Sequence, residues 1–179
     1  MQEKKLTGYP SIDKPWLKYY ENKCCLVKAD ETIYNNFWTI AKEKPDAIAC
    51  IDYKTEIKFT FSEMLNQADR FAQALVASGI SSNHKVGVLG FNCLIEPIAL
   101  LGANKIGATL VFVDPGEGIQ GMRRNVSYLD LLLLENVFAE LESEINPESI
   151  PVVLWGNTSN NHRDCVISFE SFIEKGNGL

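Results

Sequence analysis

Four short apolar segments, separated by runs with helical periodicity, constrain the fold of this chain more than any other feature. The segments lie at residues 85–91, 109–113, 131–134 and 151–155. Nearly continuous apolar character is typical of strands that are buried on both faces of a parallel sheet. The helical runs between them can serve as the crossover connections that parallel strands require. The pattern therefore predicts an α/β fold with a mainly parallel β-sheet flanked by helices.

The residues before these segments predict a helix followed by a β-hairpin. The helix begins near Asp30 or Thr32, either of which can cap it, and ends before Pro45. Its apolar face is predicted to contain Ile33, Phe37, Ile40 and Ala41. Residues 47–53 and 57–61 have the composition of strands, and the short polar segment between them can close a hairpin.

A capping box opens the next predicted helix. Thr60 can accept a hydrogen bond from the backbone at Glu63, and the Glu63 side chain can return one to Thr60. The apolar stripe of this helix is Leu65, Ala68, Phe71, Ala72 and Leu75. Gly79 follows at a position where a left-handed residue would end the helix.

The helices that follow are predicted from turn residues and apolar spacing. One starts at Asn92 or Cys93, tolerates Pro97 in its first turn, and ends at Gly107. Shorter helices are expected at residues 119–126, 137–145 and 169–175. The solvated side of the second of these is predicted to carry Glu140, Glu142 and Glu144.

Composition and charge exclude several classes of protein. Hydrophobic residues make up 46% and charged residues 22%, which is typical of a globular domain and not of a disordered chain. The net charge of -6 disfavours a nucleic-acid partner. Apolar runs are too short to span a membrane, and no signal-peptide core follows Met1. The cysteines are odd in number and include no C-x-x-C pair, so we expect reduced thiols in a cytoplasmic protein.

Residues 59–64, 71–93 and 104–115, taken in this order, resemble the adenylate-forming (AMP-dependent synthetase and ligase) superfamily. Residues 59–64, F-T-F-S-E-M, are similar to its L-T-Y-x-E-L junction. Residues 71–93 follow its L-A-x-x-L-x-x-x-G-V…G-D-x-V-A-I…N pattern, with Asn83-His84 in place of Gly-Asp. Residues 104–115, N-K-I-G-A-T-L-V-F-V-D-P, resemble its x-K-A-G-A-x-x-V-P-x-D-P motif, with Phe112 in place of Pro. Residues 7–16, T-G-Y-P-S-I-D-K-P-W, resemble the arm that precedes this module in some bacterial acyl-CoA synthetases.

The resemblance implies that residues 1–29 form an N-terminal arm and that residues 30–179 form part of an adenylation domain, truncated before the ATP phosphate loop. The parent enzyme would use ATP, Mg²⁺ and coenzyme A to convert a carboxylic acid, through an acyl adenylate, into a thioester. The sequence contains none of four features that the resemblance leads us to expect in the complete enzyme: the Ser/Thr/Gly-rich phosphate loop, the adenine motif, the ribose-binding Asp and the C-terminal Lys. We therefore expect the isolated chain to be inactive and to bind none of these cofactors tightly.

The resemblance also places Asp114, Pro115 and Gly116 near the nucleotide of coenzyme A. A plain strand-ending turn is the other interpretation of these three residues. No residue of the chain is predicted to be catalytic or to bind a metal ion.

A second class of function is suggested by the G-x-G-x-x-G sequence at residues 116–121. It follows a predicted strand and opens a predicted helix, and Glu135 lies roughly 20 residues further on, as in dinucleotide-binding Rossmann units. However, Asp114-Pro115 separates the strand from the first glycine, and bulky Met122 follows the last one. Two strand–helix units also precede it, whereas the fingerprint usually lies in the first.

A third class is a non-catalytic scaffold or interaction domain. An exposed apolar face on such a domain would lead to self-association at micromolar concentration. His84 and His162 lie in polar segments without partners at metal-ligand spacing, and are interpreted as surface residues. Cys24-Cys25 is interpreted as a pair of thiols, because adjacent cysteines rarely reach disulfide geometry.

Overall fold

The computed structural model describes Thr7 and residues 31–53, 55–156 and 164–178. The chain divides into two compact units, Met1–Glu31 and Thr32–Leu179, and the features below belong to the second. Three predicted features lie outside the described residues: nearly all of the arm over residues 1–29, the Cys24-Cys25 pair, and His162.

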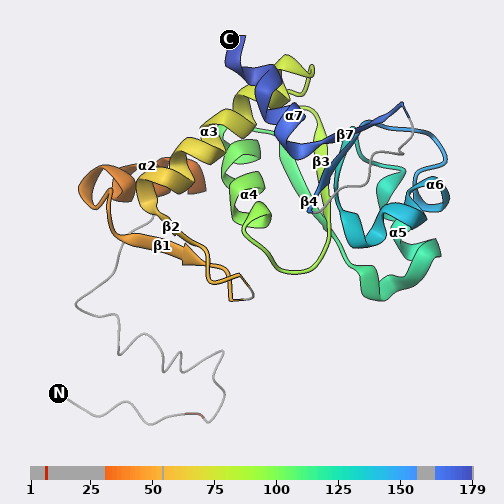
Figure 1. Ribbon diagram of the computed structural model, residues 1–179, viewed down its shortest axis with the longest axis horizontal. Helices are drawn as coiled ribbons and strands as arrows, with labels where there is room; N and C mark the ends of the chain where they lie inside the picture. Colours follow the sequence, from red (N-terminus) through yellow and green to blue (C-terminus); the bar gives the residue numbers. More distant parts are fainter. Residues whose placement is uncertain (1–6, 8–30, 54, 157–163, 179) are drawn as a thin grey trace. The chain divides into compact units, whose positions relative to one another are not determined.

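A five-stranded parallel sheet forms the centre of the second unit (Figure 1). Its strands follow the order β4-β3-β5-β6-β7, and every neighbouring pair is parallel. They are β3 (Lys85–Leu89), β4 (Thr109–Val113), β5 (Leu131–Glu135), β6 (Val152–Trp155) and β7 (Val166–Ser168). The four predicted strands are confirmed. The fifth, β7, was not predicted, because it has only three residues, all half-buried, and ends in Ser168.

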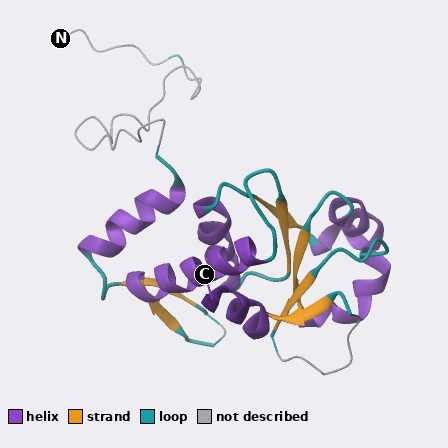
Figure 2. Ribbon diagram, turned by 90° about the horizontal axis from the view of Figure 1, so that it is seen from above, coloured by secondary structure: helices purple, strands orange, loops and turns teal. Residues whose placement is uncertain are grey.

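Helices cover both faces of this sheet, as Figure 2 shows from above. On one face lie α3 (Phe61–Ala77), α4 (Ile95–Lys105) and α7 (Phe169–Glu174), and their buried residues form one core cluster with the strands. On the other lie α5 (Gly118–Val126), η3 (Asn136–Leu141) and α6 (Glu142–Ile145), which form a second cluster. The predicted α/β class is therefore confirmed.

The centre of the core is β5. Its residues Leu131, Leu132, Leu133 and Leu134 are each at most 1% exposed. Alternate side chains point into the two clusters, so one strand anchors both helical layers. Burial of a leucine side chain stabilises a fold by about 1.5 to 3 kcal/mol, which explains why an uninterrupted apolar run identified the sheet.

The N-terminal part of the second unit contains α2 (Ile33–Glu43) and the antiparallel hairpin of β1 (Ile48–Ile51) and β2 (Lys58–Thr60). Thr32 caps α2, since its side-chain oxygen accepts a hydrogen bond from the Asn35 N–H at 3.1 Å. Both the helix and the hairpin are confirmed, with strands shorter than expected.

The predicted apolar face of α2 is partly wrong. The structure buries Tyr34 and Ala41, whereas Ile33 and Ile40 are 54% and 41% exposed. Tyr34 fixes the rotation of the helix, because its hydroxyl donates a hydrogen bond of 2.6 Å to Asp69 Oδ1. That partner lies 35 residues away and could not be identified from local spacing.

Helix α3 begins and ends as predicted. The Glu63 N–H donates to Thr60 Oγ1 at 3.2 Å, and the Thr60 N–H donates to Glu63 Oε2 at 2.8 Å, which completes the capping box. Gly79 has a φ of +83°, the left-handed conformation expected at a helix end. The following helix starts later than predicted: α4 begins at Ile95, and residues 90–94 form a loop that leads into it.

Glu142 is not the solvated residue that the sequence predicted. It is only 5% exposed, and its Oε1 accepts a hydrogen bond of 2.8 Å from Asn146 Nδ2. The Asn146 Oδ1 atom in turn accepts from the Ile150 N–H at 3.0 Å, so the pair joins α6 to the segment before β6. Glu140 and Glu144 are exposed, as predicted.

Three of the five cysteines are described, namely Cys50, Cys93 and Cys165, and none of the three forms a disulfide bond. Among the described helices none combines the length and the apolar character that a membrane crossing requires.

Candidate functional site

The carboxyl ends of β3, β4 and β5 form the candidate site. β4 and β5 pair with opposite edges of β3. The connection that leaves β3 runs through α4 on one face of the sheet, and the connection that leaves β5 runs through η3 and α6 on the other face. Such a topological switch point leaves a crevice at the carboxyl ends of the strands, where ligands of open α/β sheets usually bind.

The loop after β3 is held tightly at this crevice. The Phe91 N–H donates a hydrogen bond of 2.7 Å to Glu135 Oε2, at the end of the neighbouring strand β5. Gly90 has no room for a side chain, since a Cβ there would lie 2.9 Å from Cη2 of Trp155 and 3.0 Å from Cβ of Glu135. These contacts bring β3, β5 and β6 together and fix where the loop enters α4.

Two adjoining hollows lie beside this loop. One, of about 470 Å³, lies between the β1–β2 hairpin and the start of α4. The other, of about 290 Å³, lies between the loop and the end of β4. Asn92 and Glu96 line both of them. The two hollows therefore make one groove from the hairpin to the turn after β4, which we call the hairpin groove.

The hairpin groove is acidic. Among the described residues that line it, the charged ones are Asp52, Glu96 and Asp114, and none is Lys, Arg or His. Burial raises the pKa of the Glu96 carboxyl. A hydrogen bond from the Cys93 backbone lowers this pKa and the negative charge of Glu135 raises it, and the pKa remains above its ordinary value. Low polarity and nearby carboxylates both disfavour anions, so this groove is a poor site for a phosphate group.

Cys93 also lines the hairpin groove and lies in the loop before α4. Burial raises the pKa of its thiol, although hydrogen bonds from the backbone of Ile95 and Glu96 oppose the rise. A thiol with a raised pKa remains protonated at neutral pH and is a weak nucleophile. Cys93 is thus a partner for the first N–H groups of the helix and not a reactive group.

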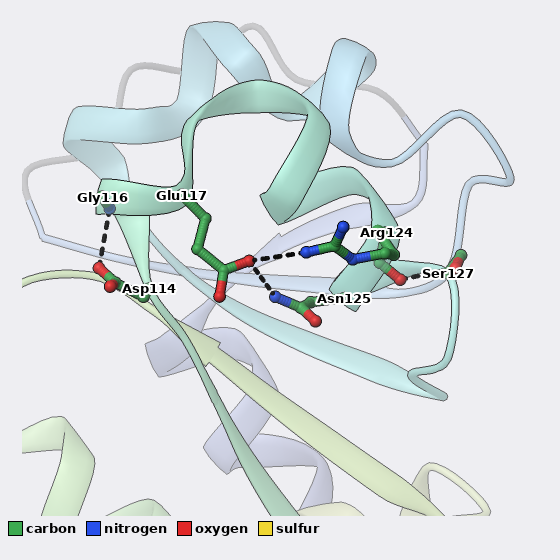
Figure 3. Close-up of polar contacts among 6 residues, drawn as sticks. All are labelled: Asp114, Gly116, Glu117, Arg124, Asn125 and Ser127. Atoms are coloured by element: carbon green, nitrogen blue, oxygen red, sulfur yellow. Dashed lines mark hydrogen bonds and ion pairs between the residues drawn. The ribbon is translucent and has the colours of Figure 1, made fainter.

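The turn Asp114-Pro115-Gly116 follows β4 at the end of the hairpin groove (Figure 3). Asp114 Oδ1 accepts a hydrogen bond of 2.8 Å from the Gly116 N–H, and Pro115 lies at the first position of the short 3₁₀ helix η2 (Pro115–Glu117). These contacts account for the sequence as a strand-ending turn. Proximity of these residues to the nucleotide of coenzyme A stays a prediction.

The glycines at 116–121 do not form the geometry of a dinucleotide site. In such sites the last glycine allows the helix to approach its strand. Here Gly121 faces Glu117, whose Oε2 would lie 2.7 Å from a Cβ added to the glycine. The same oxygen accepts hydrogen bonds from Arg124 Nη2 at 3.3 Å and Asn125 Nδ2 at 3.0 Å (Figure 3). The Glu117 carboxylate therefore fills the space beside α5. The strand before this helix, β4, is an edge strand of the described sheet.

The structure brings together residues that the sequence did not single out. Glu96, Asn92 and Asp52 lie in the hairpin groove, although only Asp114 and Pro115 of that groove were named as site residues. The available signal was their position in the chain. Asn92 and Glu96 follow the apolar strand β3, and Asp52 lies in the hairpin connection. Within the described ranges no cluster of three or more His, Cys, Asp or Glu side chains could hold a metal ion.

His84 fits its interpretation as a structural surface residue. Its Nδ1 accepts a hydrogen bond of 3.0 Å from the Ser81 N–H and lies 2.9 Å from Ser81 Oγ. These contacts close the turn that leads into β3. Of the described residues, no carboxylate hydrogen-bonds to His84, so the described contacts do not form a catalytic triad.

Solved structures of other proteins superimpose on most of the chain. Coronafacic acid ligase from Pectobacterium brasiliense matches with a TM-score of 0.73 at 15% identity, over 80% of this chain and 29% of its own. The luciferase-like enzyme from the mealworm Zophobas morio matches with a TM-score of 0.70 at 19% identity, over 80% and 35%. At these identities the likeness shows the fold.

The sequence identifies the family. A family model described as "AMP-binding enzyme" matches residues 37–130, just over half of the 179 residues, and the chain belongs to this family. The match includes all three motif stretches noted in the sequence, and the predicted resemblance is confirmed.

Curated relatives from several enzymes share this region. Surfactin synthase subunit 1 of Bacillus subtilis is 33% identical over 99 residues, which are 55% of this chain and 3% of the relative. The 4-chlorobenzoate–CoA ligase of Arthrobacter sp. is 30% identical over 89 residues, 48% of this chain and 17% of the relative. A medium/long-chain-fatty-acid–CoA/3-oxocholest-4-en-26-oate–CoA ligase of Mycolicibacterium smegmatis is 29% identical over 142 residues, 73% and 25%. The matches span at most a quarter of these relatives.

Proposed function

We propose that this chain forms the N-terminal part of an ATP-dependent acyl-CoA synthetase. Such an enzyme activates a carboxylic acid with ATP and Mg²⁺ to an acyl adenylate, releases pyrophosphate, and forms a thioester with coenzyme A. The observation that carries the proposal is the match to the Mycolicibacterium CoA ligase, because it covers 73% of the chain. The match to a second CoA ligase over 89 residues supports the same reaction class.

The described residues supply the scaffold of this enzyme and not its charged chemistry. Transfer at the α-phosphate of ATP needs cations and N–H groups directed at the developing charge. The described residues that line the hairpin groove include carboxylates and no basic side chain, which opposes that requirement. We therefore propose that ATP, Mg²⁺ and coenzyme A bind weakly, if at all, to these 179 residues alone, and that the isolated chain is inactive.

Two further properties belong to this proposal. Reduced thiols at Cys50 and Cys93 support a cytoplasmic location. Exposed apolar residues at the carboxyl edge of the sheet, Phe91, Phe112 and Val137, are 50%, 55% and 62% exposed and support self-association of the chain. Sedimentation velocity at micromolar concentration tests the association, and a strictly monomeric profile on concentration would contradict it.

Two proteins test the enzymatic proposal: the 179-residue chain and the product of the complete reading frame that contains it. We expect the longer product to catalyse acid-dependent ATP–pyrophosphate exchange and to form an acyl-CoA, whereas the chain alone does neither. Exchange by the chain alone would refute its inactivity. Exchange by the longer product without an acyl-CoA would retain the adenylation step and reject coenzyme A as the acceptor.

A further inference from the structure

A third hollow lies at the opposite end of the sheet from the hairpin groove. It has a volume of about 330 Å³ and lies at the amino ends of β5, β6 and β7, between the end of α3 and the helix α7. We call it the amino-end hollow. The described linings of this hollow and of the hairpin groove have no residue in common, so the proposed function does not explain it.

The floor of the amino-end hollow is apolar and rigid. Leu131, Val153 and Phe172 line it, and each is 1% exposed. All three belong to the core cluster on this face of the sheet, so the hollow reaches the packed interior. A volume of about 330 Å³ is at the small end of the range for ligand pockets. Its size suits a compact apolar group and excludes a nucleotide.

Among the described residues of the rim, two are carboxylates and one is a cation. The carboxylates belong to Asp130 and Asp164, and the cation belongs to Lys175. The position of Asp130 is fixed, because its Oδ2 accepts a hydrogen bond of 2.7 Å from the Lys85 N–H. The Asp130 N–H donates in return to the Lys85 carbonyl oxygen at 2.9 Å. This carboxylate is therefore already in place before any ligand arrives.

The end of α3 adds to the negative potential. Ala77 and Ser78, at the carboxyl end of this 17-residue helix, line the hollow. The carboxyl end of a helix carries a partial negative charge that lysine or arginine in the last turn usually offsets. The last turn of α3 contains no basic residue. The helix end and the fixed carboxylate thus act in the same direction.

We propose that the amino-end hollow binds a small organic cation, an amine or ammonium ion with a compact apolar body. The apolar part lies on the floor formed by Leu131, Val153 and Phe172, and the ammonium group lies at the rim beside Asp130 and the end of α3. This is a site separate from the adenylation chemistry, and its occupant would stabilise the packing of α3 on α7. The proposal does not depend on the proposed enzymatic function.

Three probes of one shape test it on the full chain by two-dimensional NMR titration. 2-Phenylethylamine carries a positive charge, 2-phenylethanol carries no charge, and phenylacetate carries a negative charge. We expect the amine to bind with a Kd of about 1 mM and to shift amides of residues 77–80, 130–131 and 165–167. The alcohol should bind more weakly, and the acid most weakly.

Variants assign the binding to this hollow. Asp130→Asn keeps an oxygen for the Lys85 N–H. We expect this variant to weaken binding of the amine by about threefold to tenfold and to leave binding of the alcohol unchanged. Ala77→Trp fills the hollow from an exposed position and should abolish binding of both the amine and the alcohol. Asp46→Asn, an exposed aspartate beyond the hollow, is the matched control and should change neither.

Several outcomes would overturn the proposal. Phenylacetate binding as tightly as the amine would reject a cation site. Shifts outside the hollow, or binding that survives Ala77→Trp, would place the ligand elsewhere. No shift with any probe up to about 20 mM would mean that the hollow binds no such ligand. If Asp130→Asn fails to fold, Asp164→Asn on the same rim provides the charge test.

Discussion

Asp69 joins three helices, and its replacement offers the sharpest test of the fold. Its Oδ1 accepts a hydrogen bond of 2.6 Å from the Tyr34 hydroxyl of α2 and lies 2.9 Å from Lys105 Nζ of α4. Asp69 itself lies on α3. The Lys105 ammonium also lies 5.1 Å from the centroid of the Tyr34 ring. One carboxylate thus holds α2 and α4 against α3.

The cost of Asp69→Ala follows from these contacts. A hydrogen bond to a charged group contributes about 1.5 to 3 kcal/mol. The ion pair with Lys105 adds at most about 1 kcal/mol, since both side chains are 35% exposed and solvent screens them. The higher helix propensity of alanine offsets about 0.5 kcal/mol of this loss of stability. We expect a loss of about 1 to 3.5 kcal/mol in the free energy of unfolding.

Chemical denaturation followed by circular dichroism measures this loss. Asn66→Ala is the matched control, because Asn66 is an exposed polar residue of the same helix and gains the same helix propensity. Tyr34→Phe and the double variant complete a cycle with Asp69→Ala, in which we expect a coupling of about 1.5 kcal/mol. Equal effects of Asp69→Ala and Asn66→Ala, or strict additivity with Tyr34→Phe, would refute the reasoning.

The same cluster predicts a loss of stability at alkaline pH. Burial raises the pKa of the Tyr34 hydroxyl, and its hydrogen bond to Asp69 raises it further. Burial alone would lower the pKa of Lys105, but its contacts with Asp69 and Tyr34 outweigh this and leave the value raised. A raised pKa contributes stability below the unfolded value, near pH 10 for both groups, which is lost as the pH rises through the folded value. Asp69→Ala should flatten this dependence.

Three other substitutions test local features by the same denaturation assay. Thr60→Ala removes the cap of α3 and should cost about 1 kcal/mol, whereas Thr60→Ser should restore most of it. Gly90→Ala would press on Trp155, so we expect a loss of about 1 to 3 kcal/mol and a changed tryptophan emission, and wild-type values would contradict the close packing. Glu142→Ala deprives Asn146 of a buried partner and should cost about 1 to 3 kcal/mol, more than Glu142→Gln.

Features that depend on neighbours in the sequence could be predicted. The capping box at Thr60 needs only the residue three positions on, and the left-handed ends at Gly79 and Gly107 need only a glycine. The strand β5 was evident because four adjacent leucines are buried on both sides of a sheet. Each of these is fixed by local chemistry, and each is observed in the structure.

Features that depend on distant partners could not be predicted. The rotation of α2 is set by Asp69 and by Asn104, whose Oδ1 accepts the Tyr34 N–H at 2.9 Å from 70 residues away. Glu142 is buried because Asn146 and the segment before β6 close over it. The groove residue Glu96 acquires its environment from the hairpin and from the end of β4. In each case the charge was visible in the sequence, but the partner that decides its role was not.

The motif that identifies the family shows how easily a scaffold can be mistaken for chemistry. Lys105 is the basic residue of the third motif, and in a nucleotide-activating family it could be read as a phosphate ligand. Its ammonium is instead held by Asp69 at 2.9 Å, at the end of α4 opposite to the hairpin groove. Asn104 beside it binds the backbone of α2. The motif therefore fixes how α2 packs on α3 and α4.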